Sequence, residues 1–199
     1  LEEKRVRAAV DDGTVEGENT VSVPDDRRKT CWKNVHRICV ASSRHFAENS
    51  AYPNSIADLI ASGGLEAVPI SPYATDKEPA SYKFTMPGSA FAFRDRGRTI
   101  IVLCTVAGPD GKVSAGFADG HVESIPPDAL SRNYSAARST PRTWSNPTGK
   151  YSTEASFVEF VAGGVKLKRS DDKTITVAYS RLGRGDLDYL KSLNVHASE

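Results

Sequence analysis

The spacing of apolar residues changes along the chain from a helical to a strand-like period, and this change limits the fold class. From residue 25 to residue 64, apolar side chains recur every three or four positions, which places them on one face of a helix. From residue 82 onward they alternate with polar side chains in short runs, as in half-buried strands. Helices followed by closely spaced strands favour an α+β fold with antiparallel sheets.

A long amphipathic helix is predicted between Pro24 and Tyr52, and a shorter helix follows it. The apolar face of the long helix is formed by Trp32, Val35, Cys39 and Phe46. Ser55 and Asp58 have the spacing of a capping box at the start of the second helix. Gly63-Gly64 can adopt the left-handed backbone that ends a helix, so the second helix is expected to stop there.

Five strand-like runs follow the helices and are expected to form an antiparallel β-meander. These runs are Tyr82–Met86, Phe91–Phe93, Thr99–Val106, Lys112–Ala118 and His121–Ile125. Only Asp119-Gly120 separates the last two runs, and a two-residue Asp-Gly loop is the preferred sequence of a type I′ turn. We therefore predict a β-hairpin in which both loop residues have positive φ.

A second set of strands follows Pro126-Pro127 and a polar segment, residues 128–140, that lacks periodicity. We interpret this segment as an inter-domain linker. Alternating apolar residues predict three further strands, within residues 151–157, 165–167 and 175–177. Asp186 is expected to cap a closing helix, so that these elements form a small β-barrel.

The chain is accordingly divided into two modules that we expect to fold independently, because the linker lacks apolar residues that could anchor it. The first module is predicted as a helix packed on the β-meander, and the second as the β-barrel. The predicted boundaries are an arm or leader at 1–24, an α+β domain at 25–127, a linker at 128–140, a barrel at 141–193 and a tail at 194–199.

The charges of the chain nearly cancel, since 26 Lys and Arg residues face 25 Asp and Glu residues. No global field would therefore attract the protein to nucleic acid. A basic cluster follows the outer face of one predicted strand, which is a common solvated pattern; it comprises Lys166, Lys168, Arg169 and Lys173. The longest apolar run, Thr99–Ala107, is shorter than the roughly 20 residues of a membrane helix. We expect a soluble chain without a nucleic-acid partner.

Three cysteines are present, at Cys31, Cys39 and Cys104. An odd number without a Cys-x-x-Cys spacing argues against a zinc site and favours three buried thiols. Cys31 and Cys39 lie eight residues apart on one predicted helix, which is too far for a mutual disulfide. If a disulfide forms, it should therefore involve Cys104.

Asp119 and His121 have the residue types of a general acid–base pair, and a hydrolase that uses them is an alternative that we consider. They flank a tight turn, however, and the sequence contains no motif that supplies a nucleophile or a phosphate-binding loop. Asp110 and Asp119 could offer oxygen ligands to Ca²⁺, although Asp110-Gly111 has the sequence of an ordinary turn. We predict no catalytic residue, no metal ligand and no cofactor.

Three segments within residues 31–125 carry a family resemblance: CWKNVHRICVASSRHFAENSAYPNSIADLI (31–60), SYKF (81–84) and FADGHVESI (117–125). In this order they resemble the pilin-like and pseudopilin-like proteins of bacterial type II secretion and type IV pilus systems. The resemblance implies a helix packed on a β-meander and an extracytoplasmic or cell-envelope location. That family begins with a membrane helix, which residues 1–24 do not contain. We expect membrane contact only through a helix absent from this chain; a soluble offshoot is the alternative.

A second resemblance lies in residues 142–191, and its landmarks are Arg142-x-Trp144, Ala155-x-Phe157, Val165-x-Leu167, Ile175-x-Val177 and Asp186-Leu187-x-Tyr189. This stretch is similar to the first Sla homology domain of eukaryotic endocytic adaptors, an SH3-like barrel. The resemblance implies binding of Asn-Pro-Phe-x-Asp peptides through a basic and an aliphatic residue, which correspond to Arg169 and Ile175. Asp171-Asp172 replaces the Asn-Gly of the adaptors, so the identity of the ligand does not follow.

The sequence therefore predicts a non-enzymatic interaction protein, in which a pilin-like domain presents a barrel that binds a protein or an extended peptide. A filament or cell-surface subunit that packs against copies of itself is the structural alternative. A homo-oligomer is compatible with either function.

Overall fold

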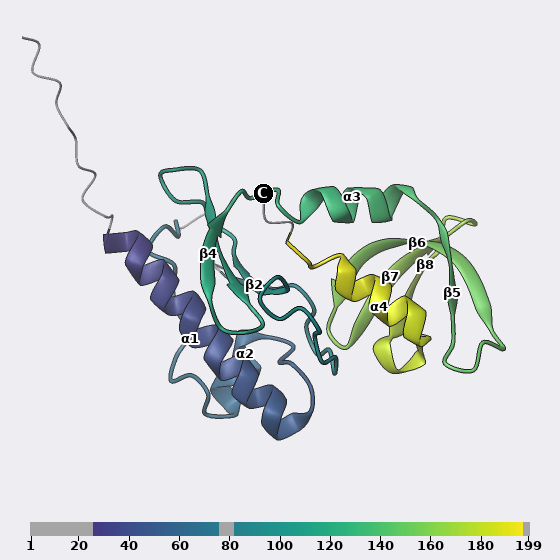
Figure 1. The fold of residues 1–199 in the computed structure, drawn as a ribbon, viewed down its shortest axis with the longest axis horizontal. Helices are drawn as coiled ribbons and strands as arrows, with labels where there is room; N and C mark the ends of the chain where they lie inside the picture. The colour runs from purple at the N-terminus through teal and green to yellow at the C-terminus, as the bar shows by residue number, and fades with distance from the viewer. Residues whose placement is uncertain (1–25, 76–81, 197–199) are drawn as a thin grey trace, which may run out of the picture.

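The computed structural model describes residues 26–75 and 82–196, so the predicted arm at 1–24 lies outside the described residues. The fold is α+β, as predicted, with helices and two four-stranded antiparallel sheets. The strands follow chain order in both sheets, β1-β2-β3-β4 and β5-β6-β7-β8. Figure 1 shows helix α1 against the first sheet and helix α3 running between the two sheets. Within the described residues, no helix has the length and apolar content of a membrane span.

Helix α1 (Asp26–Asn49) packs on strands β2, β3 and β4, and its apolar face confirms the predicted helix. Val35 and Cys39 are fully buried against the sheet. The contact is close, because a Cβ atom placed on Gly116 of β3 would lie 2.3 Å from the Cys39 sulfur and 2.7 Å from a Val35 methyl. Trp32 does not belong to the buried face, since it is 40% exposed and its indole nitrogen donates to Ser124 at the β4 edge.

Helix α2 (Ile56–Ala61) begins and ends as the sequence predicts. The Ser55 hydroxyl accepts a hydrogen bond from the backbone N–H of Asp58, which satisfies one free donor of the first turn. Gly63 has a φ of 71°, the left-handed conformation that terminates a helix. Leu59 is fully buried and anchors the short helix in the core.

Four of the five predicted runs form the first sheet, as strands β1 (Tyr82–Phe84), β2 (Ile100–Cys104), β3 (Val113–Phe117) and β4 (Val122–Ile125). The fifth run, Phe91–Phe93, is not a strand, and the prediction for it was wrong. Both of its rings are nevertheless buried, and Phe91 makes an edge-to-face contact with Tyr179 at a centroid distance of 5.0 Å. The alternation of apolar residues in this run therefore reflects the burial of two rings in a loop and not the pairing of a strand.

The predicted hairpin joins β3 to β4, but its turn differs from the expected type I′. Only Gly120 has a positive φ, 98°, and Asp119 does not. The Gly120 N–H donates to the Phe117 carbonyl, and the Phe117 N–H donates to the His121 carbonyl. This pattern fits a three-residue loop in which a type I turn is followed by a left-handed glycine, a connection almost as common as the two-residue loop.

Helix α3 (Ser131–Ser139) occupies most of the segment 128–140, so the expectation that this segment lacks periodic structure was wrong, while its role as a linker stays a prediction. Leu130 and Ala137 are buried, Tyr134 is half-buried, and the helix packs on β6. These three residues have the i, i+4, i+7 spacing of a helix face. The serine and arginine residues between them obscured the pattern.

The second sheet contains β5 (Arg142–Ser145), β6 (Ser152–Val161), β7 (Gly164–Arg169) and β8 (Thr174–Ala178), followed by the 3₁₀ turn η1 (Tyr179–Arg181) and helix α4 (Arg184–Ser192). After β8 the chain crosses back to β5, where the Gly183 N–H donates to the Ser145 carbonyl at 2.7 Å. The prediction that Asp186 caps α4 was wrong, because Gly183 occupies the N-cap position. Its buried carboxylate instead accepts hydrogen bonds from the Ser145 N–H and from the Arg142 guanidinium.

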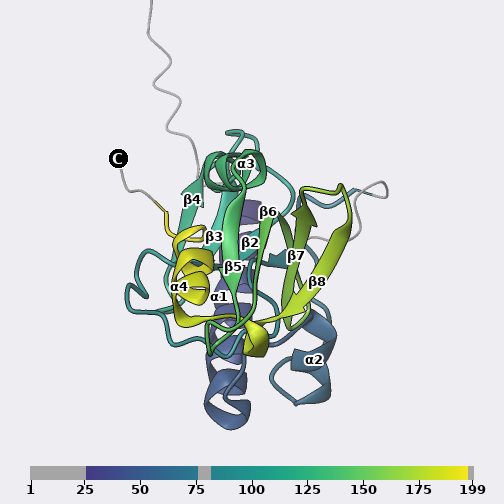
Figure 2. The same cartoon turned by 90° about the vertical axis from the view of Figure 1, so that its right-hand side faces the viewer.

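The two parts of the chain that carry the sheets share one core cluster of buried residues and are joined by a backbone hydrogen bond between loops. Figure 2 shows the second sheet facing the viewer with the first sheet behind it. The Phe91 ring packs on Tyr179, and the Gly163 N–H donates to the Pro87 carbonyl at 3.1 Å. Residues 194–196 lie antiparallel to the chain at the start of β2. The independent folding of the two predicted modules stays a prediction, and these contacts join the two sheets.

Candidate functional site

The β7–β8 hairpin brings together the two residues that the sequence singled out for peptide binding. Ile175 pairs with Leu167 across the ladder, and Arg169 follows Leu167 by two positions on β7. Side chains two positions apart on a strand point to the same face, so Arg169 and Ile175 are diagonal neighbours on one face of the sheet. Ile175 is half-buried on Leu167, whereas Arg169 is exposed. We call the face formed by Arg169 and Ile175 the hairpin surface.

The hairpin surface is flanked by carboxylates from its own loop. The Asp171 carboxylate lies 3.6 Å from the Arg169 guanidinium, and the Asp172 carboxylate lies 2.8 Å from the Lys168 ammonium. The hydrogen bond from Lys168 holds the pKa of Asp172 below its usual value. Arg169 therefore already faces an internal carboxylate, which an acidic ligand would have to displace.

A hollow of about 170 Å³ continues the same face beyond Val177, which follows Ile175 by two positions on β8. Tyr151, Arg181 and Val177 are among the residues that line this hollow. Tyr151 is 76% exposed, so its ring is accessible to a ligand. Our sequence analysis did not select Tyr151 or Arg181, because their position beside Val177 depends on the return of the chain to β5.

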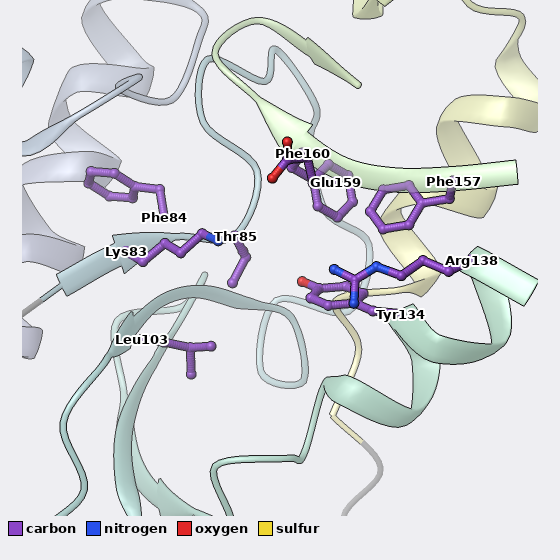
Figure 3. Close-up of a pocket in the computed structure, with 9 residues that line it drawn as sticks. All are labelled: Lys83, Phe84, Thr85, Leu103, Tyr134, Arg138, Phe157, Glu159 and Phe160. Carbon is purple, nitrogen blue, oxygen red and sulfur yellow. The ribbon is translucent and has the colours of Figure 1, made fainter. Parts of the chain in front are cut away.

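A second concave site, the inter-sheet cavity, lies between β1–β2 and α3–β6 and has a volume of about 140 Å³ (Figure 3). One wall comes from the first sheet and the other from α3 and β6. The lining residues are Lys83, Phe84, Thr85, Leu103, Tyr134, Arg138, Phe157, Glu159 and Phe160. Burial raises the pKa of Tyr134, so its hydroxyl stays protonated at neutral pH. The sequence analysis missed this site because residues 131–139 were not interpreted as a helix.

Asp119 and His121 lie together at the β3–β4 hairpin, but their contacts are those of a turn. The His121 Nδ1 atom lies 2.6 Å from the Asp119 carboxylate, and its Nε2 atom lies 3.3 Å from Glu123. The ring also stacks on Phe117 at 4.1 Å. Burial opposes ionisation of Asp119, but the hydrogen bonds from His121 outweigh it and lower the Asp119 pKa. Because both ring nitrogens of His121 already have carboxylate partners, the arrangement is explained by the hairpin.

The acidic residues that were considered for calcium are engaged in protein contacts. The Asp110 carboxylate lies 2.9 Å from the Arg28 guanidinium and accepts a hydrogen bond from the Lys112 N–H. Among residues 26–75 and 82–196, no group of three His, Cys, Asp or Glu side chains is arranged to hold a metal ion.

All three cysteines are buried and free, as the sequence analysis favoured. The Cys31 thiol on α1 and the Cys104 thiol on β2 are hydrogen-bonded to each other, which is the largest cause of a lowered Cys31 pKa of about 6. The same contact raises the pKa of Cys104. Burial raises the pKa of Cys39 to about 12, so this thiol is unreactive at neutral pH.

Comparison with known proteins finds one family model that matches part of the chain. The family model of SLA1 homology domain 1 (SHD1) matches residues 110–197, a span that contains the whole second sheet, α3 and α4. SHD1 domains bind protein or peptide partners. The match begins before residue 142, where the resemblance in the sequence began. No curated protein and no solved structure matches the chain. The resemblance of residues 31–125 to pilins receives no support from these comparisons.

Proposed function

We propose that this protein is a non-enzymatic interaction protein whose SHD1 part binds an extended acidic peptide at the hairpin surface. The observation that carries the proposal is the placement of Arg169 and Ile175 on one face of the β7–β8 hairpin. An aliphatic side chain and a guanidinium side by side suit a ligand that has an apolar residue next to a carboxylate.

Each half of the hairpin surface supplies a different interaction. Ile175, half-buried on Leu167, gives a firm apolar floor on which a ligand ring can pack. Arg169 can hold a ligand carboxylate with a charge-assisted hydrogen bond. The hollow beside Tyr151 and Arg181 lies farther along the same face and can accept residues that flank this core of the ligand.

The expected affinity is weak. Burial of one Phe side chain stabilises a complex by roughly 1.5 to 3 kcal/mol before the cost of ordering the peptide. Asp171 competes for Arg169 at 3.6 Å and weakens the complex further. Dissociation constants between about micromolar and millimolar are therefore expected, and tight binding requires several copies of the domain acting together.

The proposal is tested by titrating the full chain with an Asn-Pro-Phe-x-Asp peptide while backbone amide shifts are followed. A peptide with Phe→Ala is the ligand control, and Arg169→Glu and Ile175→Ser are expected to abolish binding. Lys33→Glu, an exposed change of the same charge on α1, is the matched control and should bind as the wild type does. Shifts that ignore the Phe, or that survive both substitutions in a folded chain, would refute the hairpin surface.

A filament or cell-surface subunit is the second candidate, in which a pilin-like first module packs against copies of itself. It is favoured by exposed apolar side chains of the first module, which are Trp32, Val40, Val68 and Ile70. Val68 is 60% exposed and Ile70 is 71% exposed, an arrangement that suits a contact between chains. This candidate includes an extracytoplasmic or cell-envelope location.

Sedimentation measurements distinguish the second candidate from a monomeric binding protein. Self-association that rises with concentration and is lost in Ile70→Lys would support the subunit function. A monomer at all concentrations, in wild type and variant alike, would contradict it.

A further inference from the structure

The inter-sheet cavity has an aromatic wall that is built by an irregularity in strand β6. Phe157 pairs with Leu167 and Phe160 pairs with Val165, while the ladder register shifts between Phe157 and Glu159. In a regular strand, residues three positions apart face opposite sides of the sheet. The extra residue, Val158, turns Phe160 to the same side as Phe157, which is how a β-bulge re-aims a side chain.

The same bulge positions a cation at the cavity. The ladder leaves Val158 without a cross-strand partner, and its carbonyl accepts a hydrogen bond of 2.9 Å from the Arg138 side chain of α3. Only the Nε atom of Arg138 is used in this bond, so the end of the guanidinium remains available to the cavity that Arg138 lines. Figure 3 shows the Lys83 side chain reaching toward the same space from the opposite wall.

Three rings in mutual contact form one wall of the cavity. Tyr134 of α3 lies 5.7 Å from Phe157 and 5.9 Å from Phe160, and the two phenylalanine rings are 5.0 Å apart. A cavity of about 150 Å³ is sufficient to hold a benzene ring. The cavity volume of about 140 Å³ therefore fits one ring rather than a larger ligand.

The charge of the site is positive. Lys83, Arg138 and Glu159 line the cavity, and Glu159 is ion-paired with Lys166 of the neighbouring strand. The hydrogen bond and the charge of Lys166 are the main causes of the lowered Glu159 pKa. Three cations thus face one carboxylate, and within the described residues Lys83 and Arg138 have no ion pair of their own. This leaves an excess of two positive charges, which a ligand carboxylate would reduce to one.

We infer that the inter-sheet cavity binds the C-terminal residue of a partner polypeptide when that residue is aromatic. The ring packs in the cavity against the wall formed by Tyr134, Phe157 and Phe160. The α-carboxylate, which is one carbon removed from the benzyl group, is then within reach of the cations at the rim. A carboxylate on the same residue as the ring needs no second residue inside a cavity that holds only one ring.

The test uses the full chain and a short peptide that ends in Phe with a free carboxylate. Leu103 lines the cavity, so its methyl signals in an NMR titration report occupancy directly. The same peptide with a C-terminal amide, the peptide with a terminal Ala and free 3-phenylpropionate are the three comparison ligands. We expect the free-acid peptide to bind about tenfold or more tightly than its amide, because the amide lacks the charge.

Variants locate the site and separate it from the hairpin surface. Lys83→Gln should weaken the free-acid peptide about tenfold and leave the amide unaffected, and Leu103→Phe should block both by filling the cavity. Arg169→Glu, which is in the hairpin surface, should leave this binding unchanged. If the full chain fails to bind the Asn-Pro-Phe-x-Asp peptide but still binds the peptide that ends in Phe, only the hairpin surface is refuted.

Three results would overturn the inference. Equal affinity for the free-acid peptide and its C-terminal amide would mean that the cations do not bind a carboxylate. Leu103 methyl signals that do not shift would place the peptide elsewhere. Phenylpropionate that binds as tightly as the peptide would assign the cavity to small aromatic acids rather than to a chain terminus.

Discussion

Removal of the negative charge at Asp171 should strengthen binding of an acidic peptide to the hairpin surface. The Asp171 carboxylate lies 3.6 Å from Arg169 and 3.8 Å from Lys173, so it occupies the position that a ligand carboxylate would take. Asp171→Asn keeps the shape of the side chain and the oxygen that accepts a hydrogen bond from the Lys173 N–H. The substitution therefore changes the charge and leaves the loop intact.

The size of the effect follows from the exposure of the pair. The side chains of Arg169 and Asp171 are 45% and 40% exposed, so the pair belongs to the surface class. Surface ion pairs contribute about 0.2 to 1 kcal/mol. Release of Arg169 from this pair should accordingly raise the affinity by about 1.4- to 5-fold.

Isothermal titration of the wild type and Asp171→Asn with the Asn-Pro-Phe-x-Asp peptide measures this gain. Asp188→Asn is the matched control, because it removes one exposed carboxylate from α4 and changes the net charge equally. The gain should shrink at high salt, since screening weakens exposed pairs. An equal gain in both variants would assign the effect to net charge, and no gain in Asp171→Asn would refute the competition of Asp171 for Arg169.

Three further predictions concern the stability and chemistry of the fold. Gly116→Ala should destabilise the protein by about 1 to 3 kcal/mol or more in urea unfolding, because α1 leaves no room for a Cβ atom. Lys166 lowers the pKa of Glu159 below its usual value of 4.5, so the ion pair stabilises the folded protein above pH 4.5, and this contribution is lost as the pH falls through the lowered pKa of the folded state. Glu159→Gln should therefore lose less stability than the wild type between neutral and acid pH. Refolding in a glutathione redox buffer should link Cys31 to Cys104 and leave Cys39 free, as peptide mapping would reveal; a bridge that contains Cys39 would contradict the structure.

The elements that were predicted correctly are those in which local pattern and tertiary burial agree. Helix α1 has an apolar face that includes the fully buried residues Val35 and Cys39. The Ser55 cap and the left-handed Gly63 are local features that need no knowledge of the fold. The β3–β4 hairpin was also predicted from a local feature, the Asp119-Gly120 loop. Its turn type was not predicted, because the sequence does not specify whether the loop contains two or three residues.

The elements that were missed depend on contacts with distant parts of the chain. Phe91–Phe93 alternates like a strand because its rings enter a core shared with Tyr179, far along the sequence. Helix α3 was missed because only Leu130, Tyr134 and Ala137 form its apolar face. Short helices with few apolar residues are stable mainly through tertiary packing, which a local pattern does not reveal.

The two candidate sites differ in the same way. Arg169 and Ile175 were selected through the resemblance to the first Sla homology domain, and the register of β7 and β8 places them on one face. The inter-sheet cavity could not be predicted, because the bulge at Val158 inserts one residue without any glycine to mark it. The cations of that cavity, Lys83 and Arg138, come from elements that are far apart in the sequence.

Helix α3 controls the cavity through contacts in two directions. Its Asn133 amide donates to the Leu193 carbonyl and its Tyr134 hydroxyl donates to the Asn194 side chain, while Arg138 donates to a carbonyl of β6. The C-terminal segment that α3 holds runs beside β2, so the helix is tied to both sheets. Together with the Phe91–Tyr179 contact and the Gly163–Pro87 hydrogen bond, this helix sets the spacing of the sheets at the cavity. The hairpin surface lies wholly within β7 and β8, so changes at the contact between the sheets should alter binding in the cavity and spare binding at the hairpin.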